Sequence, residues 1–562
     1  MIALRKAILA LFILICLLFI SLSKNYRTSV RATPSSPTTW TVDDYGPANF
    51  SRIQDAINSP LVSEGDIIYV YNGTYNENVI VNKTVALIGE NKENTIIDGS
   101  GTATVISIRA HNVSVESFTI QKSGMYAGSG IVIDHFTGNI ISNNKITVNQ
   151  EGISLYYSSG NIVCDNIITS NNEGVILSYS SNNVISRNVI FSNSYDGIIL
   201  SHSSDNMFSR NTLLYNSWAG MNFYYSTNNV VCGNTISSNQ YGISLTYSSS
   251  NNTIYHNNFI NNTDQVWSDL NLTNVWNYTD EGNYWSEYYG RDLNGDGIGD
   301  YLYIVDENNT DGFPLMGMFN EFEAFWKGET YSVTIVSNST ISDFKFEVGE
   351  ETGNKIISFN ATGEKKSVGF SRVTSPIVLM KYPYIVRVDE TEVTPNLVNI
   401  SDQTSVCLYF IYSHENYTIK IISSEALYLY YELLNKYREL QEQLFDLNDT
   451  YYNLLNNYVK LQEGIDNLNY TYYDLLYNYG QLQIYLFDLL NNYSILSVNY
   501  YGLLDGFNAV NASYQKHLAD YSEQAQNIRS IMYIFAATTA ILIITTVYLS
   551  KAVHASIKQK QE

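Results

Sequence analysis

The stretch EGISLYYSSGNIVCDNIITSNNEGVILSYSSNNVISRNVIFSNSYDG, from Glu151 to Gly197, contains two copies of one pattern and the start of a third. Each copy begins with an acidic residue and a glycine, continues with alternating apolar residues, and then places asparagines at fixed distances. The pattern recurs every 22 or 23 residues on both sides of this stretch. The glycines that mark it are Gly130, Gly152, Gly174, Gly197, Gly220 and Gly242.

Three series of asparagines keep the same step as the glycines. Chance would not keep the glycine series and the three asparagine series in phase over six copies, so the repeat is a structural unit. The three series are Asn139, Asn161, Asn183, Asn206, Asn229 and Asn252; Asn144, Asn166, Asn188, Asn211, Asn234 and Asn257; and Asn149, Asn171, Asn193, Asn216, Asn239 and Asn262.

The short alternating runs predict strands with one buried face, as at Ile153 and Leu155. Several short strands without a helical segment, repeated without spacers, predict the coils of a parallel β-helix, stacked about 4.8 Å apart. Asparagine suits the bends, since it tolerates left-handed backbone angles and its amide can bond the amide of the next coil. Cys164 and Cys232 fall three coils apart, so we expect no disulfide between them.

The flanking segments predict a multi-part protein. Residues 1–32, in which Arg5 and Lys6 precede an apolar run, are typical of a signal peptide or signal anchor. Residues 33–320 form the predicted β-helix, which ends in an Asp-rich loop. Alternating strands between turns predict a small β-sandwich over residues 321–424.

The C-terminal part changes to helical periodicity. A heptad repeat of Tyr, Leu and other apolar residues runs from Tyr430 to Tyr521 and predicts a coiled-coil stalk over residues 425–527, a single rod of about 140 Å that self-associates. Residues 528–550 are apolar enough for a transmembrane helix, and the Lys-containing residues 551–562 then form a cytoplasmic tail.

Charge and composition point to the outside of a cell. The 562 residues include 31 Lys and Arg against 54 Asp and Glu, a net charge of −23, which argues against nucleic-acid binding. Roughly seventeen Asn-x-Ser/Thr sites suit a glycoprotein. Together with the two apolar segments, they predict a single-pass cell-membrane protein with a large extracellular region.

The segment IQDAINSPLVSEGDIIYVYNGTYNENVIVNKTVALIGENKENTIIDG, Ile53–Gly99, followed by the Asn- and Gly-rich coils, resembles NosD-like parallel β-helix proteins with PbH1-type repeats. These belong to the pectin-lyase-like superfamily. The segment Gly282–Met316 resembles the closing part of archaeal cell-surface members. The resemblance covers about residues 40–318 and implies a right-handed β-helix. It also implies, as alternatives, polysaccharide lyase or epimerase activity or copper handling.

An EF-hand-like spacing marks the closing loop. Oxygen-bearing residues at offsets 1, 3, 5, 7 and 9 around a glycine at offset 6, Gly297, predict a Ca²⁺ site. Offset 12 is Tyr303 in place of the usual Glu, and a turn without an ion is the alternative. The predicted ligands are Asp292, Asn294, Asp296, Ile298 (through its carbonyl) and Asp300.

Glu151, Glu173 and Asp196 precede their glycines on successive coils, so their carboxylates should repel one another. They are the catalytic candidates if the protein is a lyase or epimerase. The basic residues Arg187 and Arg210 lie in another column, where Arg187 should pair with Asp165 of the previous coil.

A column of rings follows the same step and has two interpretations. It is either a structural ladder or a carbohydrate-binding strip. The histidines His111, His135, His202 and His256 show no spacing that would favour copper. The rings of the column are His135, Tyr157, Tyr179, His202, Tyr225 and Tyr247.

These features favour a membrane-anchored cell-surface scaffold or binding protein that contacts glycans or envelope proteins and forms homo-oligomers through its coiled coil. A surface polysaccharide lyase or epimerase is the first alternative, and a NosD-like copper accessory protein is the second.

Overall fold

The computed structural model describes residues 36–520 except 127, 401–402 and 464–468, together with 539–541 and 543–545. The chain divides into two compact units, Met1–Asn435 and Lys436–Glu562. The predicted signal peptide, the tail at 551–562 and most of the predicted span at 528–550 lie outside the described residues. Among the residues that are described, no helix is both long and apolar enough to cross a membrane.

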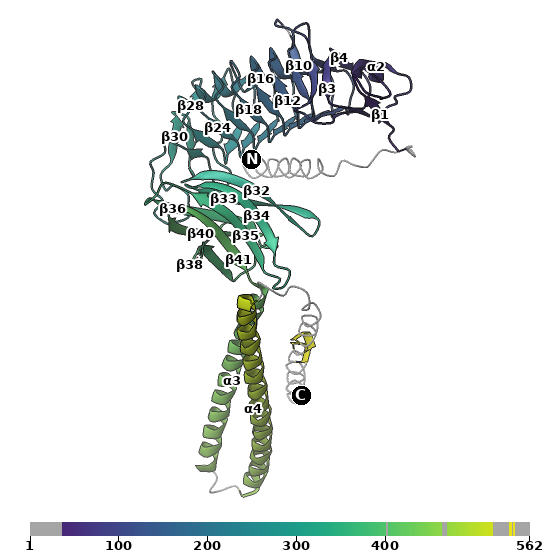
Figure 1. The fold of residues 1–562 in the computed structure, drawn as a ribbon. Coiled ribbons are helices and arrows are strands. Elements are labelled where there is room, and N and C mark those ends of the chain that lie inside the picture. Colours follow the sequence, from purple (N-terminus) through teal and green to yellow (C-terminus); the bar gives the residue numbers. More distant parts are fainter. Residues whose placement is uncertain are drawn as a thin grey trace. The chain divides into compact units, whose positions relative to one another are not determined.

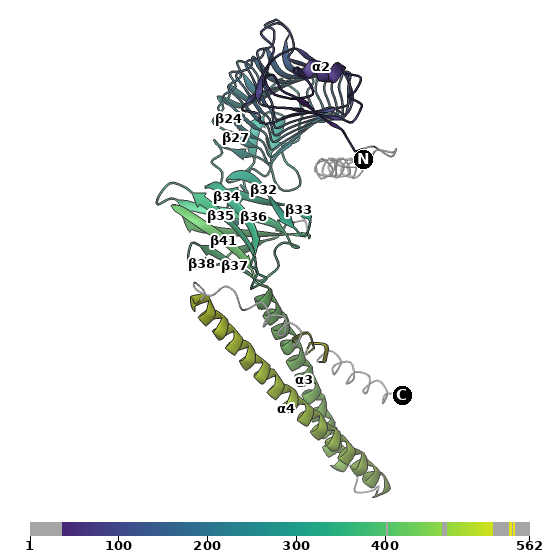
Figure 2. The same ribbon diagram turned by 45° about the vertical axis from the view of Figure 1, so that its right-hand side comes forward.

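The first unit contains the predicted parallel β-helix, and three parallel sheets run along it (Figures 1 and 2). Sheet 1 consists of β1 (Thr39–Val42), β2 (Ile67–Val70), β5 (Ala86–Gly89), β8 (Ser114–Glu116), β11 (Ile140–Ser142), β14 (Ile162–Cys164), β17 (Val184–Ser186), β20 (Met207–Ser209), β23 (Val230–Cys232) and β26 (Thr253–Tyr255). Sheet 2 consists of β4 (Val79–Val81), β7 (Ile106–Ile108), β10 (Ser129–Asp134), β13 (Glu151–Tyr156), β16 (Glu173–Ser178), β19 (Ile198–Ser201), β22 (Ala219–Tyr224), β25 (Tyr241–Thr246) and β28 (Asp264–Ser268). Sheet 3 consists of β3 (Gly73–Asn76), β6 (Thr95–Asp98), β9 (Thr119–Gln121), β12 (Lys145–Thr147), β15 (Ile167–Thr169), β18 (Val189–Phe191), β21 (Thr212–Leu214), β24 (Thr235–Ser237), β27 (Asn258–Ile260) and β29 (Tyr284–Trp285).

Asparagine ladders hold the bends of successive coils. The Asn188 amide donates to the carbonyls of Val163 at 2.8 Å and Ser186 at 3.1 Å, and to Oδ1 of Asn211 at 3.0 Å. Its own Oδ1 accepts from the backbone and side-chain nitrogens of Asn166, both at 3.0 Å. Asn188 is fully buried. The predicted ladder is therefore confirmed, and it satisfies backbone carbonyls that the bends would leave unpaired.

The glycine column reflects close packing between coils. A Cβ atom on Gly174 would lie 2.3 Å from the carbonyl oxygen of Gly197, and one on Gly152 would lie 2.4 Å from that of Gly174. No side chain fits this spacing, which explains why each coil has a glycine there. As predicted, Cys164 and Cys232 are not joined by a disulfide.

The short helix α2 (Ile53–Asn58) packs at the N-terminal end of the β-helix. Its apolar residues Ile53, Ala56 and Ile57 are buried in the core of the coils. The backbone N–H groups of Ile53 and Gln54 donate to the Glu77 carboxylate at 2.9 and 3.0 Å. This carboxylate satisfies two donors at the start of the helix that have no partner within it.

A β-sandwich follows a hairpin made of β30 (Tyr303–Asp306) and β31 (Asn309–Asp311). Its two antiparallel sheets share an apolar core that includes Val333, Phe359 and Phe410. The first sheet consists, in order, of β32 (Met318–Trp326), β33 (Glu329–Ser337), β36 (Val368–Pro376), β40 (Ser405–Ser413) and β39 (Asn396–Val398). The second consists of β34 (Thr340–Val348), β35 (Lys355–Thr362), β41 (Asn416–Ser423), β37 (Tyr384–Val388) and β38 (Thr391–Val393).

Buried charges join the sandwich to the last coils of the β-helix. Arg372 is 2% exposed and pairs with Glu281 at 2.7 Å, and His256 Nε2 lies 2.7 Å from the same carboxylate. Although burial works in the opposite direction, His256 and Arg372 lower the pKa of Glu281 to about 2. The sequence pattern did not reveal the pair of Glu281 and Arg372, because these two residues lie about ninety positions apart.

The helical region differs from the predicted single rod. It consists of α3 (Glu425–Glu463) and α4 (Asn469–Asp520), and the rings of Tyr437 and Tyr500 stack with centroids 4.5 Å apart. One uninterrupted helix would separate these residues by about 95 Å. The single-rod prediction is therefore wrong. The chain folds back on itself, so seam residues of α3 contact seam residues of α4 in the same chain.

The ladder generates a prediction about stability. Replacing Asn188 by Ala should lower the free energy of unfolding by about 2–3 kcal/mol, because the buried carbonyls of Val163 and Ser186 lose their donor. Thermal unfolding followed by circular dichroism measures this loss. Asn172→Ala is the control, since the Asn172 side chain is partly exposed. Equal melting temperatures for the two variants would contradict the role given to the ladder.

Candidate functional site

The predicted acidic column lies on sheet 2. Glu151 and Glu173 begin β13 and β16 and pair in register, and Asp196 lies just before β19. The Glu151 carboxylate accepts from the hydroxyls of Ser154 at 2.5 Å and Tyr156 at 3.0 Å. Since Ser154 and Tyr156 alternate with core residues of β13, the column faces outward.

Burial and mutual repulsion change the acidity of two of these groups. Burial, together with the negative charges of Asp196 and Glu151, raises the pKa of Glu173 to about 7, although the Asp196 backbone N–H donates to Glu173 Oε2 at 3.0 Å. Burial also raises the pKa of Asp196 to about 6. Near neutral pH the column therefore contains carboxyl groups that can carry a proton.

Asp196 is held by groups from the next coil. Its Oδ1 accepts from the backbone N–H of Ala219 at 3.0 Å, and its Oδ2 accepts from the Asn222 amide at 3.1 Å. Asn222 also donates to the Tyr224 hydroxyl at 2.9 Å, whereas its buried Oδ1 accepts no hydrogen bond in the described structure. A protonated Asp196 could donate to this oxygen if the amide turned over.

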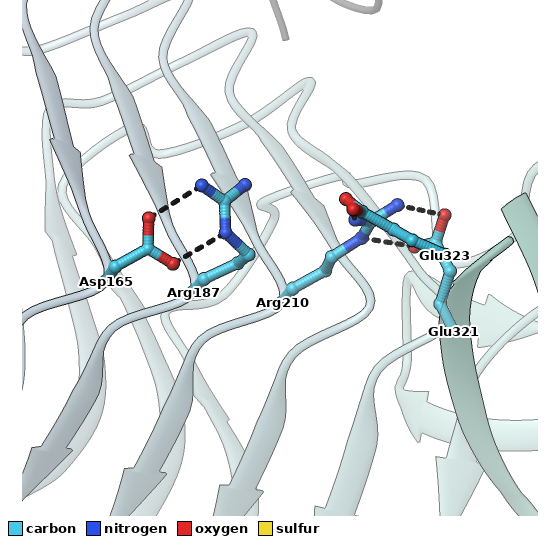
Figure 3. Close-up of a pocket in the computed structure, with 5 residues that line it drawn as sticks. All are labelled: Asp165, Arg187, Arg210, Glu321 and Glu323. Carbon is cyan, nitrogen blue, oxygen red and sulfur yellow. Dashed lines mark hydrogen bonds and ion pairs between the residues drawn. The ribbon is translucent and has the colours of Figure 1, made fainter. Parts of the chain in front are cut away.

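Two basic residues of the β-helix follow strands of sheet 1, whereas the acidic column lies on sheet 2, and both are already paired. Arg187 follows β17 and forms two hydrogen bonds of 2.7 Å with Asp165, as predicted. Arg210 follows β20 and binds Glu321, with one contact at 2.6 Å, and Glu323 at 3.2 Å, both on β32. Figure 3 shows these five side chains around a pocket between the coils and the sandwich. The pocket is thus lined by ion pairs and contributes no base to the acidic column.

The column of rings forms a continuous stack beside sheet 2. Each ring follows directly after a strand, and neighbouring centroids are 4.7–5.1 Å apart with planes inclined by 7–22°. All six residues have φ between 46° and 68°, a conformation that costs about 1 kcal/mol and that stacking of this kind can offset. Because each ring covers the face of the next, sugar rings could reach only the edges of most of them. The geometry favours the structural interpretation of the ladder.

A second aromatic group, not recognised in the sequence, lies on the outer side of sheet 2. Trp218 precedes β22, Tyr241 begins β25 and Trp267 lies in β28. The side chains of Trp218 and Trp267 are 41% and 50% exposed. Exposed tryptophans in a regular repeat are the signal that could have identified this group, but they do not share one column of the repeat.

The predicted Ca²⁺ loop is a tight Asx-rich turn. Asp292 Oδ1 accepts from the backbone N–H of Gly295 at 2.7 Å, and Asp292 Oδ2 accepts from Gly297 at 2.9 Å. The Asn294 amide donates to Asp296 at 3.0 Å, and Leu293 N–H donates to Asp300 at 2.5 Å. The loop oxygens are therefore used for the turn itself.

The histidines do not converge. His135 and His202 are separated in the ring stack by two tyrosines, His111 contacts Phe136, and His256 stacks on Phe319. In the part of the chain that the structure describes, no three His, Cys, Asp or Glu side chains are grouped as metal ligands.

The acidic column generates a prediction about pH. Because the pKa of Glu173 is higher in the folded protein than its ordinary value of 4.5, the stabilising effect of its protonated form is present below pH 4.5 and is lost as the pH rises through 7. Glu173→Gln should therefore melt like the parent at pH 4 and at a higher temperature at pH 8. Scanning calorimetry across this range measures the difference.

The control is Glu347→Gln, which changes an exposed glutamate of the sandwich. It should give a melting difference that does not grow with pH. A parent protein as stable as Glu173→Gln at pH 8 would contradict the assigned acidity.

Comparison with known proteins shows which family the β-helix resembles. The family model described as "Periplasmic copper-binding protein (NosD)" matches residues 58–221 and 94–290. A cell surface glycoprotein of Methanothermus fervidus is 38% identical over 98 residues, which are 17% of this chain. The match spans only 16% of that relative's length.

Comparison with solved structures gives matches of low overall similarity. The A-module of mannuronan C-5 epimerase AlgE4 of Azotobacter vinelandii is 16% identical; the match covers 40% of this chain and 91% of that one, with a TM-score of 0.28. An alginate lyase of Paenibacillus sp. str. FPU-7 is 14% identical, with coverage of 41% and 94% and a TM-score of 0.27. The repeat, the three parallel sheets and the family match agree, and we conclude that residues 58–290 form a NosD-like parallel β-helix.

Proposed function

We propose that the protein is a membrane-anchored cell-surface protein whose β-helix binds glycans or envelope proteins through the outer face of sheet 2. The observation that carries this proposal is the composition of that face. It presents an ordered array of carboxyl, hydroxyl and aromatic side chains on successive coils, and its acidic column has no basic partner among the described residues of the face. Such a surface is suited to binding rather than to proton abstraction.

Display outside the cell is supported by the sequence and by one relative. The apolar segments near both ends, the many glycosylation sites and the similarity to a cell surface glycoprotein all agree with it. In this proposal residues 528–550 anchor the chain and residues 551–562 form its cytoplasmic tail.

We also propose that the helical region mediates self-association. Four leucines of α3, spaced seven residues apart, occupy every second position of its apolar seam. In the α3–α4 hairpin their side chains remain between 36% and 49% exposed. A second copy of the hairpin could bury this stripe. The leucines are Leu433, Leu440, Leu447 and Leu454.

The enzymatic alternative has less support from the geometry. A lyase or epimerase acting on uronates needs a base at the reacting carbon and cations that neutralise the sugar carboxylate. Arg187 and Arg210, two basic residues of the same coils, are held in ion pairs elsewhere. The copper alternative has no converging histidines among the described residues.

Surface display can be tested with the full chain carrying a C-terminal epitope tag, produced in an archaeal host. Protease added to intact cells should digest the β-helix and leave a short tagged fragment, because only the tail is inside. Deletion of residues 531–549 should release the protein into the medium. Full-length protein that is protected in intact cells would contradict the proposed orientation.

We propose separately that the loop from Asp292 to Asp300 binds Ca²⁺, on the basis of its ligand spacing. Binding would require Asp292 and Asp296 to exchange some of their backbone hydrogen bonds for the ion. Arg372 packs against Gly297 of this loop, so its positive charge would compete with a cation.

Isothermal calorimetry of Ca²⁺ into the full chain in detergent should show heat that disappears in Asp296→Ala, because one of the predicted ligands is lost. Asp55→Ala, which changes an exposed aspartate of α2, is the matched control and should retain the heat. Absence of heat in the parent would exclude the site.

A further inference from the structure

The aromatic group of Trp218, Tyr241 and Trp267, hereafter the Trp218 cluster, differs from the ring stack in how its members touch. The rings of Trp218 and Tyr241 meet edge to face, with centroids 5.1 Å apart and planes at 75°. Those of Tyr241 and Trp267 are 5.7 Å apart and tilted by 53°. Contacts of this kind cover less of a ring face than parallel stacking does. The two half-exposed tryptophans can therefore offer ring faces to a ligand.

The register of sheet 2 places carboxyl groups on both sides of this cluster. Tyr241 pairs with Ala219 on one side and with Asp264 on the other. Asp196 binds the backbone of Ala219, so it lies on the side opposite to Asp264. Hydrogen-bonding groups therefore flank the exposed rings along the axis of the β-helix. Aromatic faces beside carboxyl and hydroxyl groups are the combination that recognises a sugar ring, which has apolar faces and a polar edge.

The charge of the face determines which sugars it suits. The outer side of sheet 2 carries Asp134, Glu151, Glu173, Asp196 and Asp264 between residues 129 and 268. The same 140 residues contain three basic side chains, none of them in a strand of sheet 2. A polyuronate brought to the coils of the Trp218 cluster would meet like charges without a counter-ion from the protein. Uncharged sugars meet no such repulsion.

These basic side chains are also engaged elsewhere. Lys145 lies on β12 of sheet 3 and contacts Glu93 at 3.1 Å. Arg187 and Arg210 hold the ion pairs shown in Figure 3. None of the three is available to neutralise an anionic ligand over sheet 2.

We propose that the Trp218 cluster is a binding subsite for an uncharged glycan. This inference rests on the proposed function and specifies where on sheet 2 the ligand lies and to which class it belongs. Sugar rings stack on Trp218 and Trp267, and their hydroxyls bond the neighbouring carboxyl groups. Because the two tryptophans come from different coils and are offset along the strand direction, a linear glycan that crosses the coils obliquely contacts both.

The test uses the full chain in detergent and biolayer interferometry on immobilised polysaccharides. Mannan, dextran and laminarin are the uncharged probes, and alginate and polygalacturonate are the anionic ones. At least one uncharged probe should retain the protein better than both anionic probes. Trp218→Ala and Trp267→Ala should each weaken this retention at least tenfold. The control variant is Tyr289→Ala, which removes an aromatic side chain that is 92% exposed elsewhere, and it should bind like the parent.

The outcomes separate this inference from the broader function. Binding of an uncharged probe that is unchanged in both tryptophan variants overturns the subsite but leaves glycan binding intact. Stronger retention on the anionic probes overturns the ligand class. No retention on any probe overturns the inference together with glycan binding, while the protease test of surface display stands independently. Unchanged circular dichroism spectra and melting temperatures ensure that a loss in the variants reflects contacts rather than unfolding.

Discussion

The hydrogen bond between asparagine amides on successive coils is the interaction on which the rest of the structure depends. Every coil must bend sharply, and each bend buries carbonyl groups that no strand can pair. The Asn188 amide supplies donors to two of them and is itself bonded to Asn166 and Asn211 above and below. Each amide serves as both donor and acceptor, so the loss of one asparagine leaves buried polar groups without partners. Packing of apolar residues does not offset the free energy that is then lost.

This ladder keeps the step between coils at 22 or 23 residues. A residue type that recurs with this step therefore lies at the same place on successive coils and forms a column. Columns can be neutral in function, as the ring stack illustrates: its parallel contacts stabilise strained turns and leave few free ring faces. They can also change acidity, because burial beside the carboxylates of Asp196 and Glu151 raises the pKa of Glu173. Whether a column binds a ligand is then decided by local geometry. The tilted rings around Tyr241 leave part of their faces uncovered, whereas the parallel rings beside Tyr179 cover one another's faces.

The helical region illustrates what a heptad repeat leaves undetermined. A heptad repeat specifies that an apolar seam must be covered, but it does not specify whether the cover comes from another chain or from the same chain after a reversal. Stacking of Tyr437 on Tyr500 shows that the chain itself supplies part of the cover. The leucine stripe of α3 remains half-exposed, so α4 of the same chain and a helix of a second chain can both pack against α3.

The sequence by itself determined the parts of the protein that repeat. The parallel β-helix, the asparagine ladders and the Asp165–Arg187 pair could be predicted, because stacking makes residues one period apart into neighbours. Only the tertiary structure decided the contacts of Arg210 with Glu321, of Arg372 with Glu281, and of Trp218 with its aromatic neighbours. These contacts join the coils to the sandwich or combine different columns, and no period in the chain relates their members. They depend on how separate surfaces pack and on side-chain orientation, which a pattern of residue types does not encode.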